Sequence, residues 1–118
     1  MVCHIVLFRP HAKLTVEDRR TLADAFATAR QDIPSIRRFH IGRRARVGAG
    51  YEDAMPEELT HAAVVEFDDR DGLEAYLHHA SHDALGTLFG SMADRALIYD
   101  FEMTDDPTAI RQLALDEG

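Results

Sequence analysis

Residues 61–103, HAAVVEFDDRDGLEAYLHHASHDALGTLFGSMADRALIYDFEM, contain two β-rich apolar segments with a helical pattern between them. The first segment, His61 to Phe67, is rich in valine and alanine, and the second, Leu97 to Met103, closes the stretch. Both have the length and the β-branched or aromatic content that are typical of strands. The stretch therefore predicts the order strand, helical region, strand.

Two short helices are predicted between these strands. Asp68 and Asp69 can cap the first helix and Ser81 the second, because short side-chain oxygens accept from the free N–H groups of a first helical turn. Apolar residues follow each cap at helical spacing. They are Leu73, Tyr76 and Leu77 in the first helix, and Leu85, Leu88, Phe89 and Met92 in the second.

The preceding part of the chain repeats this order. Cys3–Phe8 is an apolar run that predicts a strand, and Val16–Ile33 has the periodicity of an amphipathic helix that begins after Thr15 and ends at Pro34. Ile36–Val47 alternates apolar and polar side chains, which predicts a long strand at a sheet edge, followed by a loop. The complete order is β-α-β-β-α-β, an α+β ferredoxin-like sandwich.

The composition limits the class of protein. The chain has 118 residues, of which 46% are hydrophobic, so it fits one domain with a real core. A net charge of −8 argues against a general nucleic-acid binder. No apolar stretch approaches the roughly 20 residues of a membrane span, and the apolar N-terminus lacks a basic leader. With Cys3 as the single cysteine, we expect a cytoplasmic protein with no nucleic-acid or membrane partner.

Four polar residues are candidates for a site. His4 and His61 begin the first and third predicted strands, which we expect to be parallel neighbours, so both histidines would lie at one end of the sheet. Tyr76 and His82 lie on the helices that return toward that end. A neutral imidazole at a helix N-terminus can act as a base, and a tyrosine hydroxyl can donate to a carbonyl oxygen, which suits proton abstraction beside a carbonyl. The same residues also fit a purely structural role, with partly buried histidines and a core tyrosine.

Several short segments resemble the stress-responsive A/B-barrel (Dabb) family over residues 1–103. They are His4–Phe8, Val64–Phe67, Ala75–Leu77 with Ser81-His82, and Ile98–Phe101. One departure is Ser81, where the family pattern has a proline before the last histidine. Residues 104–118 would form a C-terminal tail, either a short helix or disordered.

The resemblance implies a homodimer in which two sheets pack face to face as a dimeric α+β barrel. We expect a stress-response-like protein that binds a small apolar or aromatic ligand between sheet and helices, without a cofactor. The expected site has His82 and Tyr76 as catalytic candidates, lined by His4, His61, Phe67 and Leu85. The alternative is a cofactor-free cyclase that closes a poly-β-ketone by aldol condensation with the Tyr-His pair. A monooxygenase-like member of the wider barrel class is a third alternative, without a cofactor motif in its favour.

Two further patterns carry less weight. His78 and His79 are adjacent on a helix and cannot both face one pocket, so no metal site is expected. Five arginines cluster in the second strand: Arg37, Arg38, Arg43, Arg44 and Arg46. They suit a charged edge strand that resists pairing with other chains, or the binding of a carboxylate or phosphate of a ligand.

Overall fold

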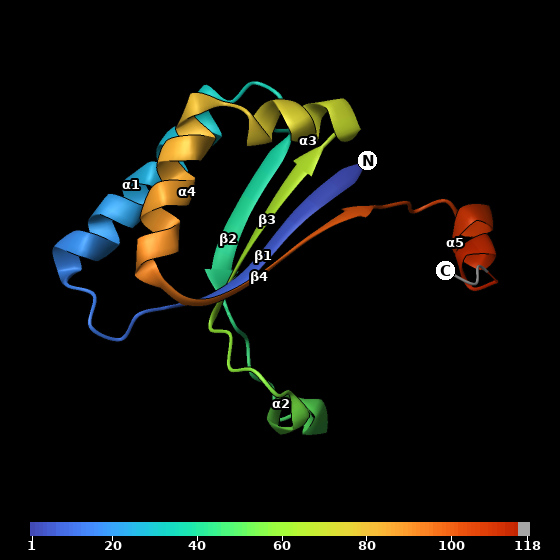
Figure 1. Cartoon of the computed structure of the whole chain (residues 1–118). Coiled ribbons are helices and arrows are strands. Elements are labelled where there is room, and N and C mark those ends of the chain that lie inside the picture. Colours follow the sequence, from blue (N-terminus) through green and yellow to red (C-terminus); the bar gives the residue numbers. More distant parts are fainter. Residues whose placement is uncertain (116–118) are drawn as a thin grey trace.

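The computed structural model describes residues 1–115 and shows a four-stranded sheet with helices on one face (Figure 1). The elements in chain order are β1 (Val2–Pro10), α1 (Val16–Asp32), β2 (Arg38–Arg43), α2 (Gly50–Ala54), β3 (His61–Phe67), α3 (Arg70–Leu77), α4 (Ala80–Met92), β4 (Ala93–Glu102) and α5 (Pro107–Leu113). The ferredoxin-like order is confirmed, with α5 lying in the predicted tail. Residues 116–118 of that tail lie outside the described part.

The strands are arranged β2-β3-β1-β4, and every neighbouring pair is antiparallel. The expectation that β1 and β3 run parallel is therefore wrong. Helix α1 carries the chain back along the sheet, so that β2 runs parallel to β1. The connection after β2 then reverses the chain direction for β3. Strand β3 enters between them in the opposite direction, with His61 opposite Phe8 and Val65 opposite His4.

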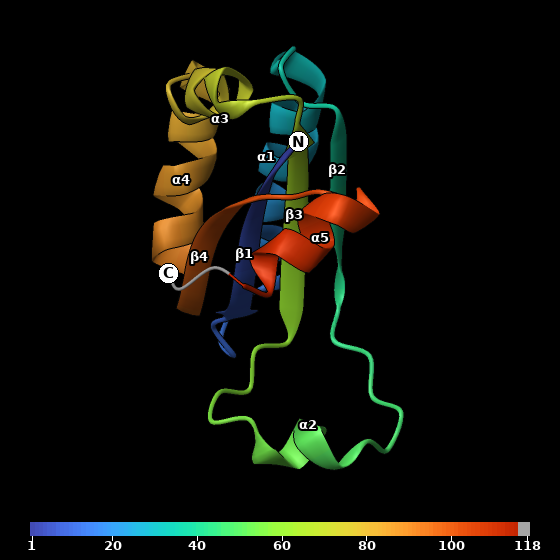
Figure 2. The same cartoon turned by 90° about the vertical axis from the view of Figure 1, so that its right-hand side faces the viewer.

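The core lies between the sheet and the layer formed by α1, α3 and α4 (Figures 1 and 2). Phe8, Val65 and Phe67 are the largest fully buried side chains on the sheet. Helix α1 begins with a capping box, in which the Thr15 hydroxyl accepts from the backbone N–H of Asp18 and the Asp18 carboxylate accepts from that of Thr15, both at 3.0 Å. These contacts fix where α1 starts to cross the sheet.

Three predicted boundaries need correction. Strand β2 ends at Arg43 and not at Val47, because the chain then leaves the sheet as an arm, residues 44–60, that carries α2 (Figure 2). Helix α4 is capped by His79, whose Nδ1 accepts from the Ser81 N–H at 3.0 Å, and not by Ser81. Strand β4 begins at Ala93, directly after α4.

The other face of the sheet carries no layer of helices; α5 stands off in front of it (Figure 2). We call this the open sheet face; it comprises Ile5, Leu7, Val64, Tyr99 and Phe101. Ile5 lies opposite Val64 on one side and Tyr99 on the other, so apolar side chains form a row across three strands. Tyr99 is 54% exposed and Phe101 48%, and large apolar side chains exposed side by side are typical of an interaction surface.

Candidate functional site

A buried histidine and a partly exposed carboxylate form a pair on the helix side of the sheet. His4 on β1 is 5% exposed, and its Nδ1 lies 2.6 Å from Oδ1 of Asp100 on β4. The two residues are directly opposite in the β1–β4 register, which explains the contact. A carboxylate oxygen can only accept, so His4 Nδ1 donates, which leaves Nε2 as the ring nitrogen available to other groups.

Tyr76 of α3 lies between this pair and His82. Its ring centroid is 5.4 Å from that of His4 and 4.7 Å from that of His82. The side chain is 3% exposed, and burial, with a smaller effect from the Asp100 charge, raises the pKa of Tyr76 to about 12. The hydroxyl therefore remains protonated across the physiological range and acts as a hydrogen-bond donor.

His82 is the third residue of α4, and its Nδ1 is buried without a hydrogen-bond partner in the described part of the chain. Burial lowers the pKa of His82 below its usual 6.5, and the neighbouring His4 lowers it further, against smaller opposing effects of Asp83 and the Leu77 carbonyl. The ring is therefore neutral at pH 7. A buried polar atom left without a partner costs roughly 1–3 kcal/mol, so such an atom is a natural place for a ligand to bind.

The structure thus brings together three of the four predicted polar residues: His4, Tyr76 and His82. The prediction that His61 joins them is wrong, because β1 and β3 are antiparallel. His61 lies opposite Phe8, ~13 Å along the sheet from His4 at roughly 3.3 Å per residue. There its ring stacks on Phe8 at 5.3 Å, and its Nδ1 lies 2.7 Å from the Thr60 hydroxyl.

The two apolar candidates, Phe67 and Leu85, lie in the hydrophobic core around Tyr76. Phe67 is 0% exposed, and its ring centroid is 5.2 Å from that of Tyr76. Their position supports the tyrosine ring from the core side. Asp100, by contrast, has no signal in the sequence, because only the strand register reveals that it lies beside His4, with its side chain still 40% exposed.

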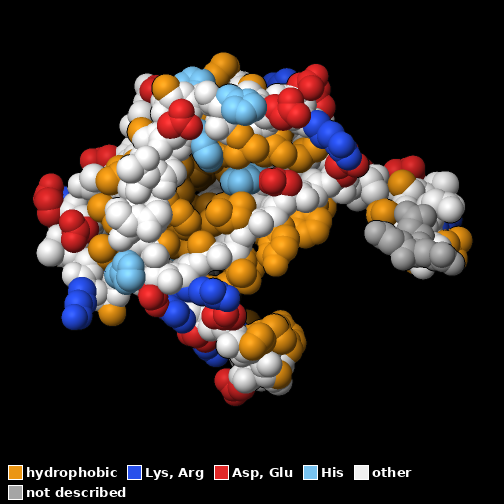
Figure 3. Space-filling view, in the orientation of Figure 1, with side chains coloured by type: hydrophobic (Ala, Val, Ile, Leu, Met, Phe, Trp, Pro, Cys, Tyr) orange, Lys and Arg blue, Asp and Glu red, His pale blue; other side chains and the backbone are white. Residues whose placement is uncertain are grey.

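The surface is hollowed beside this group. Figure 3 shows a hollow between α4 and the strands β1 and β4, with apolar side chains inside and histidine and acidic side chains at its rim. A cavity of about 250 Å³ also borders the site, with Asp100, Val2 and Leu73 in its lining. Within residues 1–115, no group of three or more His, Cys, Asp or Glu side chains is placed to hold a metal ion. No helix in that range has the length and apolar character to cross a membrane.

The family model for the stress-responsive A/B-barrel domain, Dabb, matches residues 2–103. The chain belongs to the Dabb family. A Dabb protein with a ferredoxin-like fold from Mesorhizobium loti is 21% identical, with a TM-score of 0.66 over 87% of this chain and 96% of that chain. These findings confirm the predicted family and the ferredoxin-like fold.

Two further solved structures share the fold of this Dabb chain. A dimeric ferredoxin-like protein of unknown function from Thermobifida fusca is 24% identical, with a TM-score of 0.68 over 86% of this chain and 90% of that chain. Hydroxynitrile lyase from Passiflora edulis is 12% identical, with a TM-score of 0.74 over 89% of this chain and 94% of that chain. The search of curated proteins found no match. At these identities the similarities show the fold and not a shared activity.

Proposed function

We propose that this Dabb protein is a homodimer that binds a small apolar or aromatic molecule at His4, Asp100, Tyr76 and His82. The observation that carries the proposal is the buried Nδ1 of His82, which has no hydrogen-bond partner among residues 1–115. The protonated Tyr76 and the His4–Asp100 pair lie beside this nitrogen, so a ligand hydroxyl or carbonyl would find both hydrogen-bond donors and acceptors there. The hollow beside the group offers access from solvent (Figure 3).

The open sheet face supports the proposed dimerisation. A domain of this size leaves much of its apolar surface exposed, and a second copy would cover the row through Ile5, Val64 and Tyr99. Solved structures with this fold from Thermobifida fusca, Bacteroides fragilis and Jannaschia are described as dimeric. The ligand site lies on the opposite face, so dimerisation would leave it open.

The ligand proposal is tested by fluorescence titration with 2-naphthol, an aromatic alcohol. We expect His82→Phe, which keeps a ring but removes both nitrogens, to weaken binding about fivefold to tenfold, because one buried hydrogen bond is worth about 1 kcal/mol. Asp100→Asn should weaken binding by a similar factor through the orientation of His4.

The matched control for this titration is His78→Phe, because His78 is an exposed histidine at the end of α3 and is not part of the group. It should bind 2-naphthol like the unaltered protein. Equal affinity in all four proteins would show that 2-naphthol binds elsewhere and would refute the site.

A second candidate is a cofactor-free cyclase, favoured by the neutral imidazole of His82 beside the protonated Tyr76. His82 would take a proton from a carbon between two carbonyl groups, and the resulting enolate would attack a second carbonyl carbon. The Tyr76 hydroxyl would stabilise the oxygen anion that forms, and the protonated His82 would then return its proton to that oxygen, which regenerates the neutral base. The step is an aldol addition, so it needs no oxidant and no reductant.

The cyclase candidate predicts a pH dependence. Because the pKa of His82 is depressed, the base stays neutral down to below pH 6.5, and kcat should then fall as the pH drops further and the ring becomes protonated. The measurement is cyclised product from a linear poly-β-ketone thioester, followed between about pH 5 and 8. His82→Phe should abolish the reaction. Product formation no faster than in buffer would exclude this candidate and leave ligand binding untouched.

A further inference from the structure

The end of the sheet that holds His61 carries an unusual concentration of positive charge. A cavity of about 480 Å³ opens there, and His61, Thr60 and Glu58 contribute to its lining. Five arginines also line it: Arg9, Arg19, Arg43, Arg44 and Arg46. In a chain with a net charge of −8, such a local excess marks a place where an anion is attracted.

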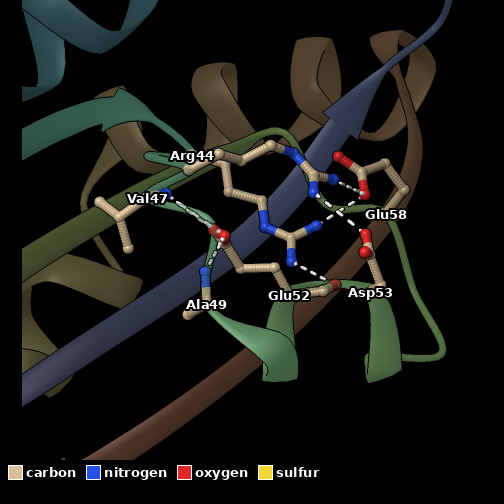
Figure 4. Close-up of polar contacts among 7 residues, drawn as sticks. Arg44, Val47, Ala49, Glu52, Asp53 and Glu58 are labelled. Carbon is tan, nitrogen blue, oxygen red and sulfur yellow. Dashed lines mark hydrogen bonds and ion pairs between the residues drawn. The ribbon is translucent and has the colours of Figure 1, made fainter.

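Three of these arginines already have structural partners. Arg44 and Arg46 both bind the Glu58 carboxylate at 2.6 Å, and Arg44 also donates to the Glu52 carbonyl at 3.0 Å (Figure 4). Arg9 pairs with Asp94 at 2.8 Å. The contacts of Arg44 and Arg46 hold the arm in place, and together the three pairings neutralise much of the positive charge on the outer side of the cavity.

Arg19 and Arg43 differ from them, since neither forms an ion pair within residues 1–115. Arg43 lies opposite His61 in the β2–β3 register, on the helix side of the sheet, and Arg19 reaches the same cavity from α1. Both guanidinium charges act on His61: burial, then Arg43 and Arg19, lower the pKa of its imidazole. Two unpaired cations from different elements therefore converge on one histidine.

The position of Arg43 also favours one of the two roles considered for the arginine cluster, the binding of an anionic ligand group. Arg37 and Arg38 are paired with Asp68 and Glu66 and lie along the edge strand, where charge discourages pairing with other chains. Arg43 shares its cavity with a residue of the helical layer. Arg19 belongs to α1 and not to the edge strand, so protection of the sheet edge does not explain why it lines the same cavity as Arg43.

An apolar pocket adjoins the arginine cavity. Its volume is about 170 Å³, and the two share Pro10, Arg19 and His61. The remaining lining is almost entirely apolar: Phe8, Leu14, Leu22, Ala23, Phe26 and Ile41. An apolar cavity of about 150 Å³ accepts a benzene ring, so this pocket suits one aromatic ring.

We infer that this end of the sheet is a second ligand site, for an aromatic anion, with its ring in the apolar pocket and its carboxylate or phosphate between Arg19 and Arg43. Guanidinium groups bind such oxygens with two parallel hydrogen bonds each, which gives both strength and orientation. The neutral His61 ring presents Nε2 at the junction, because its Nδ1 is engaged with Thr60. The site is independent of the group around His82, which lies toward the opposite end of the sheet.

The test compares three probes by NMR titration of the full chain. They are 3-phenylpropionate, its neutral analogue 3-phenylpropanamide, and inorganic phosphate. We expect 3-phenylpropionate to bind at least about tenfold more tightly than the amide, because only the acid meets the arginines. Arg19→Gln and Arg43→Gln should each remove most of that difference and leave binding of the amide unchanged. Phosphate should bind more weakly than the acid, since it lacks the ring.

Arg20→Gln serves as the control, because Arg20 is the exposed neighbour of Arg19 on α1 and does not line the cavity. His82→Phe should also leave binding of 3-phenylpropionate unchanged, which separates this site from the proposed binding function. Equal affinity for acid and amide, or an unaltered affinity in Arg43→Gln, would overturn the inference. Phosphate binding as tight as that of the acid would overturn the role of the apolar pocket.

Discussion

Phe67→Ala should lower the free energy of unfolding by about 3–5 kcal/mol, because it removes a fully buried aromatic ring from the centre of the core. The ring contacts Tyr76, and the Cβ of Phe67 lies only 3.2 Å from where a Cβ on Gly72 would stand, so α3 packs closely over this strand. The neighbours can collapse only in part into the space left behind. The loss is measured by denaturant unfolding monitored by circular dichroism.

Phe101→Ala is the matched control, since Phe101 is the same residue type on the open sheet face and is 48% exposed. Measured at low protein concentration, where a dimer is dissociated, it should cost well under the loss in Phe67→Ala. Similar losses in both variants would mean that the core is not centred between sheet and helices. Because Phe67 also supports Tyr76, the first variant should weaken binding of 2-naphthol as well.

Much of the fold could be predicted from the sequence because its local signals agree. The run from His61 to Phe67 gives β3 with its observed bounds, and Thr15 with Pro34 limits α1 to within a residue. In these segments the hydrophobic period, the caps and the chain breakers indicate the same structure. Such agreement is what makes local prediction succeed.

The site was harder to predict because it depends on strand direction and register. His4, Tyr76 and His82 meet as expected, but His61 does not, because chain direction alternates through β2 and β3 and separates it from His4. Asp100 could not be assigned to the site, since the sequence does not fix which residue of β4 lies opposite His4. A shift of one residue would have turned its carboxylate to the other face.

The arm after Arg43 was missed for a different reason. The alternation through Val47 continues the pattern of a strand, yet Arg44 and Arg46 turn to Glu58, and the Glu52 carboxylate accepts from the N–H groups of Val47 and Ala49 (Figure 4). These polar contacts within the arm replace the hydrogen bonds that a longer β2 would have made. Periodicity alone carries no information about them.

Tyr99→Asp should convert the proposed dimer into a monomer, with a dissociation constant raised more than about a thousandfold. Two copies related by a two-fold axis would each bury the new carboxylate against apolar side chains, and an unpaired buried charge costs several kcal/mol. Tyr99 lies opposite Ile5 on the edge strand β4 and is 54% exposed, so its side chain is available to a partner subunit. Sedimentation velocity between about 1 and 100 µM measures the effect.

Val16→Asp is the control for charge, because Val16 is an exposed apolar residue at the start of α1, on the helix side of the molecule. It should sediment like the unaltered protein, and as a first-turn acid it suits the helix dipole. An unaltered chain that is monomeric at 100 µM, or a Tyr99→Asp variant that remains dimeric, would refute dimerisation through this face. Binding of 2-naphthol by the monomeric variant would then show that each subunit holds a complete site, as its location on the helix side of the sheet requires.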